Sequence, residues 1–277
     1  SEPTTKKIPN PIARWDFETD VRDKMGSLHG KLNGGAIIEN GKLIVGRKNG
    51  YFTSEPLDRD LGEKTLQVLV QLDNLNQQGG GALGIQILDG HIFDSIVFAE
   101  SDPAQWLPGS EFHRRTQRPG GPRETAANKQ AVWITMTYAK DGTIKVYRNG
   151  AQYGRSYKKA GLLNFQKGKA QAIIGVRHGG PSAGKLLAGK IDEARLFDRA
   201  LSQKEVGLTI GMEMPPSRKE ILNLLTDTQK ASLKKLEEQL EILRDRGSEM
   251  KRGSRPSNPL ADLAHSLFNS KEFIYVR

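Results

Sequence analysis

Three carboxylates stand at alternate positions near the start of the chain. Asp16, Glu18 and Asp20 follow one another at i, i+2 and i+4 in the run WDFETD. If this run is an extended strand, these side chains share one face, with neighbours roughly 6.6–7 Å apart. That separation is compatible with the carboxylate pair of a glycosidase, in which one group protonates the leaving oxygen. The alternative is a solvent-facing strand edge without chemistry.

A second group of candidates falls in residues 104–129, a long segment rich in glycine and proline. Aromatic faces stack on sugar rings, and arginines recognise carboxylate or sulfate through paired hydrogen bonds. A long loop of this kind in a compact β-domain is commonly functional. We predict that its ligand contacts are Trp106, Phe112, His113, Arg114, Arg115, Arg118 and Arg123. In the alternative interpretation, the two aromatic side chains anchor the loop on the core and the arginines are only solvated.

A third candidate is a cation site. Asp192 shares a strand face with Ala194 and Leu196 in the run KIDEARLF, and a partly buried carboxylate needs N–H groups, an arginine or a cation as its partner. Calcium, which prefers carboxylate and carbonyl oxygens, is one possibility, with Asp23 as a second ligand. The other is a structural carboxylate that pins a turn or pairs with an arginine. The histidines show no metal-ligand spacing, so no zinc site is predicted.

Composition narrows the class of protein. The 277 residues include no cysteine, which excludes disulfides, thiolate metal sites and a cysteine nucleophile within this chain. The formal net charge of +10 suits nucleic acid, anionic polysaccharide or an anionic cell surface. No nucleic-acid-binding motif accompanies the charge, which disfavours a nucleic-acid partner. No run approaches the roughly 18 apolar residues of a membrane span, and the first residues, SEPTTKK, contain no signal-peptide core.

The elements that must position these residues are predominantly strands. Short alternating runs separated by turn signals extend over residues 13–206, the pattern of a β-sandwich. The clearest hairpin is TMTYAKDGTIKVYRNG, with Asp141-Gly142 as its tight turn. Its first strand is expected to face the core with Val132, Ile134, Met136 and Tyr138. The expected strands are 13–18, 42–45, 51–53, 65–72, 82–88, 95–99, 131–139, 144–148, 170–176 and 190–197.

The C-terminal quarter reads differently. A helical arm is expected over residues 211–246, after Met214-Pro215-Pro216, with capping residues Ser217 and Thr226 at its two helix starts. The second helix carries an apolar seam formed by Leu233, Leu236, Leu240 and Leu243. This arm either packs on its own domain or forms a self-associating or partner-binding coil, although two heptads are marginal alone. Residues 1–10 form a polar leader, and residues 247–277 a basic linker and terminal segment.

Two motifs carry a family resemblance. The run LAGKIDEARLFDRALSQKEV, residues 187–206, is an alternating strand that ends in a helical turn, where Ser202 and Glu205 form a capping box flanked by Leu201 and Val206. It resembles the closing strand and turn of laminin G-like, concanavalin A-like lectin domains, and WDFE resembles their opening strand. The resemblance covers roughly residues 11–210. It implies an all-β, concanavalin A-like two-sheet jelly-roll sandwich with a C-terminal α-helical extension.

The resemblance also implies what such a domain does. Relatives of this fold frequently hold calcium near the junction of the first and last strands, where Asp192 and Asp23 are expected. Glucanase relatives carry an E-x-D-x-x-E strand, which this chain lacks, so no catalytic residue is predicted. The implied function is a non-catalytic carbohydrate- or surface-ligand-binding module that favours anionic glycans. A structural protein–protein interaction module is the alternative, and a glycoside hydrolase or lyase is third.

The end of the chain carries its own resemblance. The run NPLADLAHSLFNSKEFIYVR, residues 258–277, resembles the C-terminus of large bacterial multidomain proteins with a planctomycete-type cytochrome c module. Those proteins often insert a laminin G-like domain, and VYRNGAQYG and IIGVRHGG resemble stretches of it. Because the chain has no Cys-x-x-Cys-His motif, redox activity is not implied. The resemblance implies a periplasmic, cell-surface or secreted location.

Overall fold

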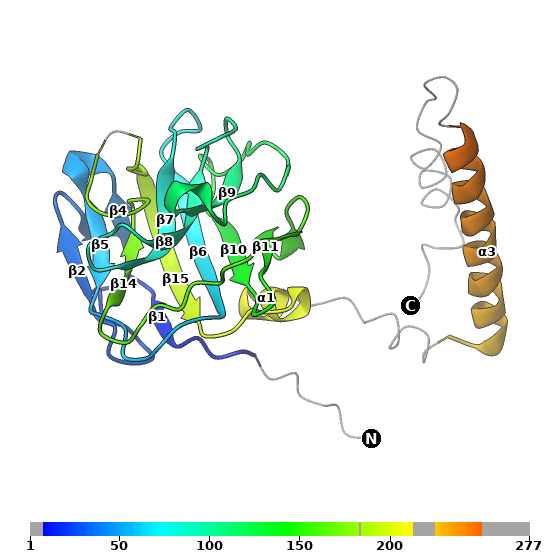
Figure 1. Ribbon diagram of the computed structural model, residues 1–277, viewed down its shortest axis with the longest axis horizontal. Helices are drawn as coiled ribbons and strands as arrows, with labels where there is room; N and C mark the ends of the chain where they lie inside the picture. Colours follow the sequence, from blue (N-terminus) through cyan, green and yellow to red (C-terminus); the bar gives the residue numbers. More distant parts are fainter. Residues whose placement is uncertain (1–7, 183, 213–224, 251–277) are drawn as a thin grey trace. The chain divides into compact units, whose positions relative to one another are not determined.

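The structure, a computed structural model, describes residues 8–182, 184–212 and 225–250. The chain divides into two units, residues 1–214 and 215–277. The described part of the first is a β-domain, and that of the second contains one long helix (Figure 1). The predicted all-β sandwich with a C-terminal helix is confirmed.

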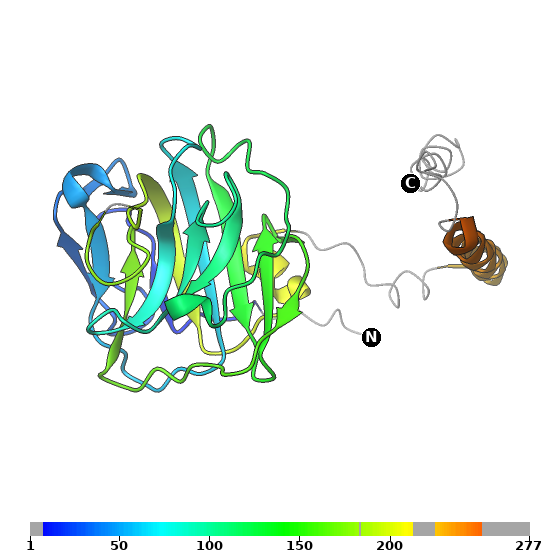
Figure 2. The same cartoon turned by 45° about the horizontal axis from the view of Figure 1, so that its top comes forward.

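Two antiparallel sheets form the sandwich, and Figure 2 shows them as facing layers. The nine-stranded sheet has the order β12-β11-β10-β6-β15-β4-β3, with β1 paired to β15 and β13 paired to β11. Its strands are β1 (Ala13–Trp15), β3 (Ile37–Glu39), β4 (Lys42–Val45), β6 (Lys64–Leu72), β10 (Val132–Tyr138), β11 (Thr143–Arg148), β12 (Ala151–Gln152), β13 (Tyr157–Lys158) and β15 (Gly189–Phe197). The six-stranded sheet has the order β2-β5-β14-β7-β8-β9. Its strands are β2 (Gly30–Asn33), β5 (Tyr51–Ser54), β7 (Gly80–Ile87), β8 (Phe93–Phe98), β9 (Trp106–Ser110) and β14 (Ala170–Ile174).

The core lies between the sheets and is built mainly by alternation along the strands. On β10 the predicted inward set is correct, because Val132, Ile134, Met136 and Tyr138 are all at most 1% exposed and belong to the main apolar cluster. From the six-stranded sheet, Ile85, Ile96 and Phe98 contribute to the same cluster. A Val, Leu, Ile, Phe or Met buried in this way contributes about 1.5–3 kcal/mol, so these facing rows supply much of the driving force for folding.

A short helix covers part of the outer face of the nine-stranded sheet. Helix α1 (Gln203–Thr209) begins with the predicted capping box, in which Ser202 accepts from the Glu205 N–H. Leu201 and Val206 pack with Tyr147 and Phe197 in a second, smaller apolar cluster. This cover explains why the outward-facing Thr135 is also buried: its hydroxyl accepts from Gln67, which reaches Thr209 of α1 as well.

The ten expected strands are all present, with ends shifted by a few residues, but five further strands were not predicted. The most consequential is β9, which lies inside the segment expected to be a loop. Its sequence, WLPGS, contains Pro108 and Gly109, which argue against a central strand. The structure places β9 at the edge of its sheet, where a proline need not donate a ladder hydrogen bond.

The second unit contains helix α3 (Asp227–Met250). Thr226 caps it as predicted, because its hydroxyl accepts from the Gln229 N–H and the Gln229 side chain accepts from the Thr226 N–H. The helix extends four residues beyond the expected end of the arm at 246. The expected first helix after Ser217, most of the basic linker and the terminal segment 258–277 lie outside the described residues. Within the ranges that are described, no helix is long and apolar enough to cross a membrane.

Candidate functional site

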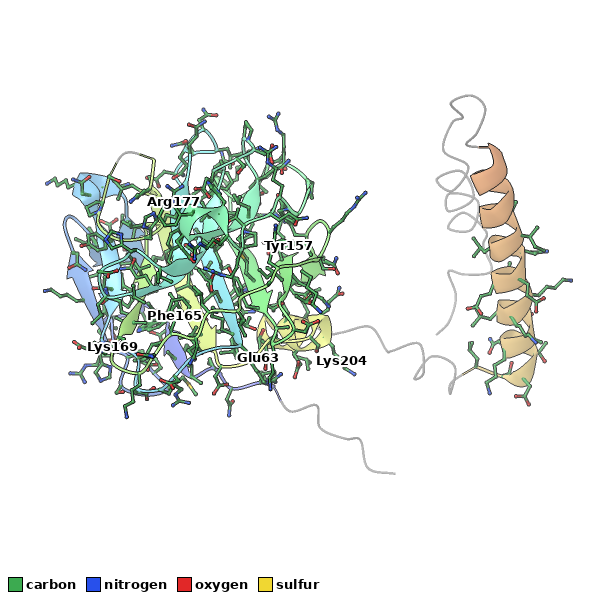
Figure 3. The ribbon with its side chains drawn as sticks, in the orientation of Figure 1. Glu63, Tyr157, Phe165, Lys169, Arg177 and Lys204 are labelled. Carbon is green, nitrogen blue, oxygen red and sulfur yellow. The ribbon has the colours of Figure 1, made fainter. Side chains whose placement is uncertain are left out.

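An open pocket of about 400 Å³ lies beside β8 and β9. Strand β8 alternates, so that Ile96 and Phe98 point into the core while Phe93 belongs to the opposite face. The 3₁₀ turn η2 (Glu111–His113) and the segment after β14 supply the remaining walls. Arg177 in that segment is labelled in Figure 3. The pocket is lined by His91, Phe93, Glu100, Ser110, Glu111, Phe112, His113, Arg177 and His178.

One part of the pocket lining is a stacked pair of rings. His178 lies parallel to Phe93, with ring centroids 4.1 Å apart and an interplanar angle of 9°. Burial lowers the pKa of His178 to about 4, so the ring is neutral at pH 7. Its Nδ1 lies 3.0 Å from the Gly90 carbonyl oxygen and must carry the proton to donate there. The other ring nitrogen, Nε2, is then a hydrogen-bond acceptor.

The charged groups of the pocket are already paired. Arg177 hydrogen-bonds Glu100, and both side chains are largely buried. Glu111 accepts two hydrogen bonds from Arg115. Burial opposes ionisation of Glu111, but these bonds outweigh it and lower its pKa. A carboxylate held ionised in this way is poorly suited to act as a general acid.

Phe112 and His113 form an exposed rim. Phe112 is 87% exposed, the largest value among the exposed large apolar side chains of the described residues. Both residues adopt positive φ angles, 47° and 55°, a conformation that costs free energy for a side chain other than glycine. The ring of Phe112 therefore presents an aromatic face to solvent at the rim of the pocket.

The turn that carries Phe112 is anchored by buried charges. Arg115 is 4% exposed and donates to Asp94 at 2.9 Å, to Glu111 at 2.5 and 2.9 Å, and to the Phe93 carbonyl at 3.1 Å. Lys64, fully buried, lies 2.9 Å from the other Asp94 oxygen. Burial disfavours the charge on Arg115, but the two carboxylates prevail and raise its pKa. These buried hydrogen bonds and ion pairs therefore hold η2 against strand β8.

Trp106 is also an anchor. It is fully buried, packs against Phe98 with ring centroids 4.8 Å apart, and donates from Nε1 to Glu124 at 3.1 Å. Arg148 donates two further hydrogen bonds to the same carboxylate, each 2.8 Å long. Burial opposes ionisation of Glu124, but the bonds from Arg148, the Ala126 N–H and Trp106 lower its pKa to about 2.

The structure therefore divides the predicted ligand-binding residues. Phe112 and His113 line the pocket, and Arg114, Arg118 and Arg123 are exposed. The prediction of ligand contact is corrected for Trp106 and Arg115, because neither presents a surface to solvent. For Trp106 the alternative interpretation, an anchor on the core, describes what is seen.

The two expected calcium ligands, Asp23 and Asp192, each have protein partners in the structure. The carboxylate of Asp23 accepts hydrogen bonds from four backbone N–H groups, those of Arg14, Met25, Gly26 and Leu28, and so pins a turn. Asp192 falls at a β-bulge between Ile191 and Glu193, which removes it from the face of Ala194, and it pairs with Lys42. Within the described ranges, no three His, Asp or Glu side chains are placed to hold a metal ion.

The three early carboxylates do not share a strand face either. Strand β1 ends at Trp15, and Phe17 has a φ of 53°, which breaks the extended geometry. Asp16 and Asp20 converge instead on one lysine, with oxygens 3.5 and 3.1 Å from Lys24 Nζ. The strand geometry behind the glycosidase interpretation of this segment is absent.

Sequence reasoning missed most of the pocket. His91, Glu100, Arg177 and His178 line the pocket from outside η2, and the sequence analysis names none of them as a ligand contact. The usable signal was the run VRHGG, which places an arginine and a histidine directly after a strand and before two glycines that must form a turn.

The comparisons with known proteins agree with this architecture. A sequence profile of the laminin G type, described as the concanavalin A-like lectin/glucanases superfamily, matches residues 46–207, more than half of the chain. The chain belongs to this superfamily. A comparison with curated proteins gave no match.

Solved structures share the fold at low sequence identity. Domain 4 of the extracellular arabinanase AbnA from Geobacillus stearothermophilus, solved in complex with arabinotriose, superposes with a TM-score of 0.55 and 16% identity, covering 73% of this chain and 99% of that domain. Trypanosoma rangeli sialidase superposes with a TM-score of 0.52 and 14% identity, covering 72% of this chain but only 32% of the sialidase. At such identities the likeness shows the fold alone. A carbohydrate-related role is plausible for a domain of this superfamily, with neither sugar nor site specified by it.

Proposed function

We propose that this domain is a non-catalytic carbohydrate-binding module that holds its glycan in the pocket beside η2. The observation that carries the proposal is the exposed Phe112 at the pocket rim, held outward in a left-handed conformation above the buried Arg115 network. Phe112 supplies a stacking face, and Ser110, His113 and His178 offer hydrogen-bonding groups for sugar hydroxyls. The exposed arginines that follow Phe112 favour acidic glycans.

Two features support binding over catalysis. The pocket carboxylates, Glu100 and Glu111, are each engaged by an arginine, whereas glycoside hydrolysis needs one free acid and one nucleophile or base. Domain 4 of the arabinanase, which has a similar fold and was solved with bound arabinotriose, is one domain of a larger enzyme. By analogy, we infer a module of a bacterial envelope or secreted protein, of the multidomain cytochrome type that its C-terminal sequence resembles.

A glycan array tests this function. It should include neutral, uronic-acid and sulfated polymers, and should be repeated with Phe112→Ala. Loss of the stacking face should weaken binding by about tenfold. Ile37→Ala is the matched control, because Ile37 is an exposed apolar residue of β3 in the other sheet, and it should bind like the parent.

Two results would reject the proposal. If the parent binds glycans on the array and Phe112→Ala binds them equally well, the site lies elsewhere on the domain. Turnover of a polysaccharide by the purified chain would make it an enzyme.

A second candidate, a protein-interaction module, rests on α3. Leu236, Ile242 and Leu243 are 38%, 53% and 50% exposed on this helix, so part of the predicted apolar seam is accessible to a partner helix. Sedimentation velocity of the whole chain tests this function. If the chain self-associates and Leu236→Asp abolishes the association, the interaction function is favoured. If the chain is a monomer at all concentrations, self-association through α3 is excluded.

A further inference from the structure

A second surface lies next to the pocket and is strongly basic. Arg114 directly follows His113, which lines the pocket. Arg118 and Arg123 follow in the same loop, and Arg155 lies in the turn between β12 and β13. All four arginines are exposed. We call this set, Arg114, Arg118, Arg123 and Arg155, the arginine rim.

Hydrogen bonds hold its two segments together. The Arg155 N–H donates to the Pro119 carbonyl at 2.7 Å, which places Arg155 beside the residue that follows Arg118. The Tyr153 hydroxyl donates to the Pro122 carbonyl at 2.5 Å, directly before Arg123. The rim is therefore assembled from segments 32 to 41 residues apart, which are joined by a backbone hydrogen bond and the Tyr153 hydroxyl rather than by the arginine charges.

The same anchoring reaches toward Arg114. The hydroxyl of Tyr157, labelled in Figure 3, donates to the Arg115 carbonyl at 2.9 Å and accepts from the Gln117 N–H at 3.3 Å. The loop also packs tightly here, because a Cβ on Gly121 would lie 2.3 Å from the Tyr153 ring. A pre-ordered loop backbone loses little conformational entropy when a ligand binds, so the ordering cost falls on the arginine side chains.

Little of the rim's charge is neutralised by the protein. Asp102 lies 3.3 Å from Arg118, and the nearby Glu124 is occupied by Arg148. Across the described residues, no ion pair is formed by Arg114, Arg123 or Arg155. Arginine, with its planar fork of donors, fits carboxylate and sulfate groups better than a lysine point charge does.

We propose that the arginine rim binds the anionic groups of an acidic polysaccharide whose adjoining sugar residues occupy the pocket. This inference rests on the proposed function and assigns its preference for acidic glycans to four named arginines, and the rim can be tested separately from the pocket. The anionic group is a carboxylate or a sulfate, since both suit the same guanidinium geometry.

The experiment measures affinity for polygalacturonate, dextran sulfate and neutral dextran at low and physiological salt. The variant is Arg114→Gln, Arg118→Gln and Arg155→Gln together, which removes three charges and keeps hydrogen-bonding capacity. Its affinity for the preferred acidic polymer should fall about 30-fold at low salt, at about threefold for each exposed charge contact. The parent should also bind less tightly as salt rises, because exposed charges are screened beyond about 8–10 Å.

The matched control removes three charges elsewhere, at Lys31, Arg47 and Lys48. These residues are exposed and lie in β2 and in η1 (Arg47–Asn49), near β4 and β5 and on the other side of the sandwich from β11 in Figure 1. Lys31→Gln, Arg47→Gln and Lys48→Gln should change affinity by less than about twofold.

The possible outcomes separate the two proposals. If the Phe112→Ala variant loses neutral and acidic glycans while the rim variant loses only acidic ones, both proposals stand. If the rim variant binds acidic polymers like the parent, or no more weakly than the control variant, the inference fails and the pocket remains. If acidic polymers bind through the rim regardless of Phe112, the pocket fails, and with it the placement of the adjoining sugars there, while the rim remains as the anion site. If a random-sequence DNA duplex binds as tightly as both acidic polymers, the rim is a general polyanion surface and the inference of a glycan ligand is overturned.

Discussion

Arg114 and Arg115 are adjacent in sequence and opposite in environment. Arg114 is exposed, whereas Arg115 is 4% exposed and joins Asp94 to Glu111. The same contrast runs through the whole segment: Trp106 and Glu124 are buried, while Phe112, Arg118 and Arg123 are exposed. Buried charges and rings hold the loop in place, and exposed ones are left available. Composition alone cannot distinguish the buried residues of this segment from the exposed ones, because both groups contain arginine and aromatic side chains.

Arg115→Ala should give the largest loss of stability. It leaves Asp94 and Glu111 buried without their shared cation, which costs about 3–5 kcal/mol. Urea unfolding followed by tryptophan fluorescence measures this change. Arg114→Ala is the control and should stay within about 0.5 kcal/mol of the parent. If both substitutions changed the free energy of unfolding equally, Arg114 and Arg115 would not differ in their contribution to stability.

Trp106→Ala should cost a similar amount, about 3–5 kcal/mol, because it opens a cavity in the core. Trp106→Phe keeps a smaller aromatic ring in the core and removes the hydrogen bond to Glu124, so it should cost less, about 1.5–3 kcal/mol. Thermal unfolding of the three proteins compares them. A Trp106→Ala protein as stable as the parent would show that this side chain does not anchor the loop.

Acid should lower the free energy of unfolding over a defined pH range, because Glu124, one of the buried residues of this segment, becomes protonated. Glu124 has a folded pKa of about 2, below the ordinary value of 4.5. Its ionised form therefore stabilises the protein by about 3 kcal/mol above pH 4.5, and this contribution is lost as the pH falls from 4.5 toward 2. Unfolding free energies measured across this range should show a smaller slope for Glu124→Gln than for the parent. Identical slopes would mean that other carboxylates dominate.

The smallest expected effect is at Phe112, in the exposed half. Because φ is 47° there, Phe112→Gly should be more stable than Phe112→Ala by about 0.5–1 kcal/mol. Chemical denaturation of the two variants gives this difference directly. If alanine proves the more stable, the turn is not under backbone strain. A gain in stability on removing the ring would indicate that Phe112 is retained for something other than folding.

Much of the sandwich could be predicted from local patterns. Strand β10 alternates cleanly, Asp141-Gly142 closes its hairpin with β11, and Ser202 with Glu205 marks the start of α1. Each of these signals depends on residues close together in sequence. The resemblance at residues 187–206 added the fold class, which the superfamily match supports.

The site could be predicted only in part, because it depends on distant partners. Arg115, just after η2, is buried because it meets Asp94 of β8, and Arg177 meets Glu100 across 77 residues. A single bulge at Asp192 reverses the face that alternation assigned to it. For the exposed part of the loop, including Phe112 and His113 in the pocket, ligand binding stays a prediction.

The position of β15 has a consequence for how this chain is made. It is the last strand of the described residues, yet it lies between β6 and β4 and also pairs with β1, where Ala13 faces Leu196. At cellular rates of synthesis, the roughly 180 residues between those partners take about 10–40 s to emerge. Throughout that interval β4 and β6 lack their shared neighbour, and β1 has no strand to join. The nascent chain must therefore keep its early strands from pairing with other chains until its last strand arrives.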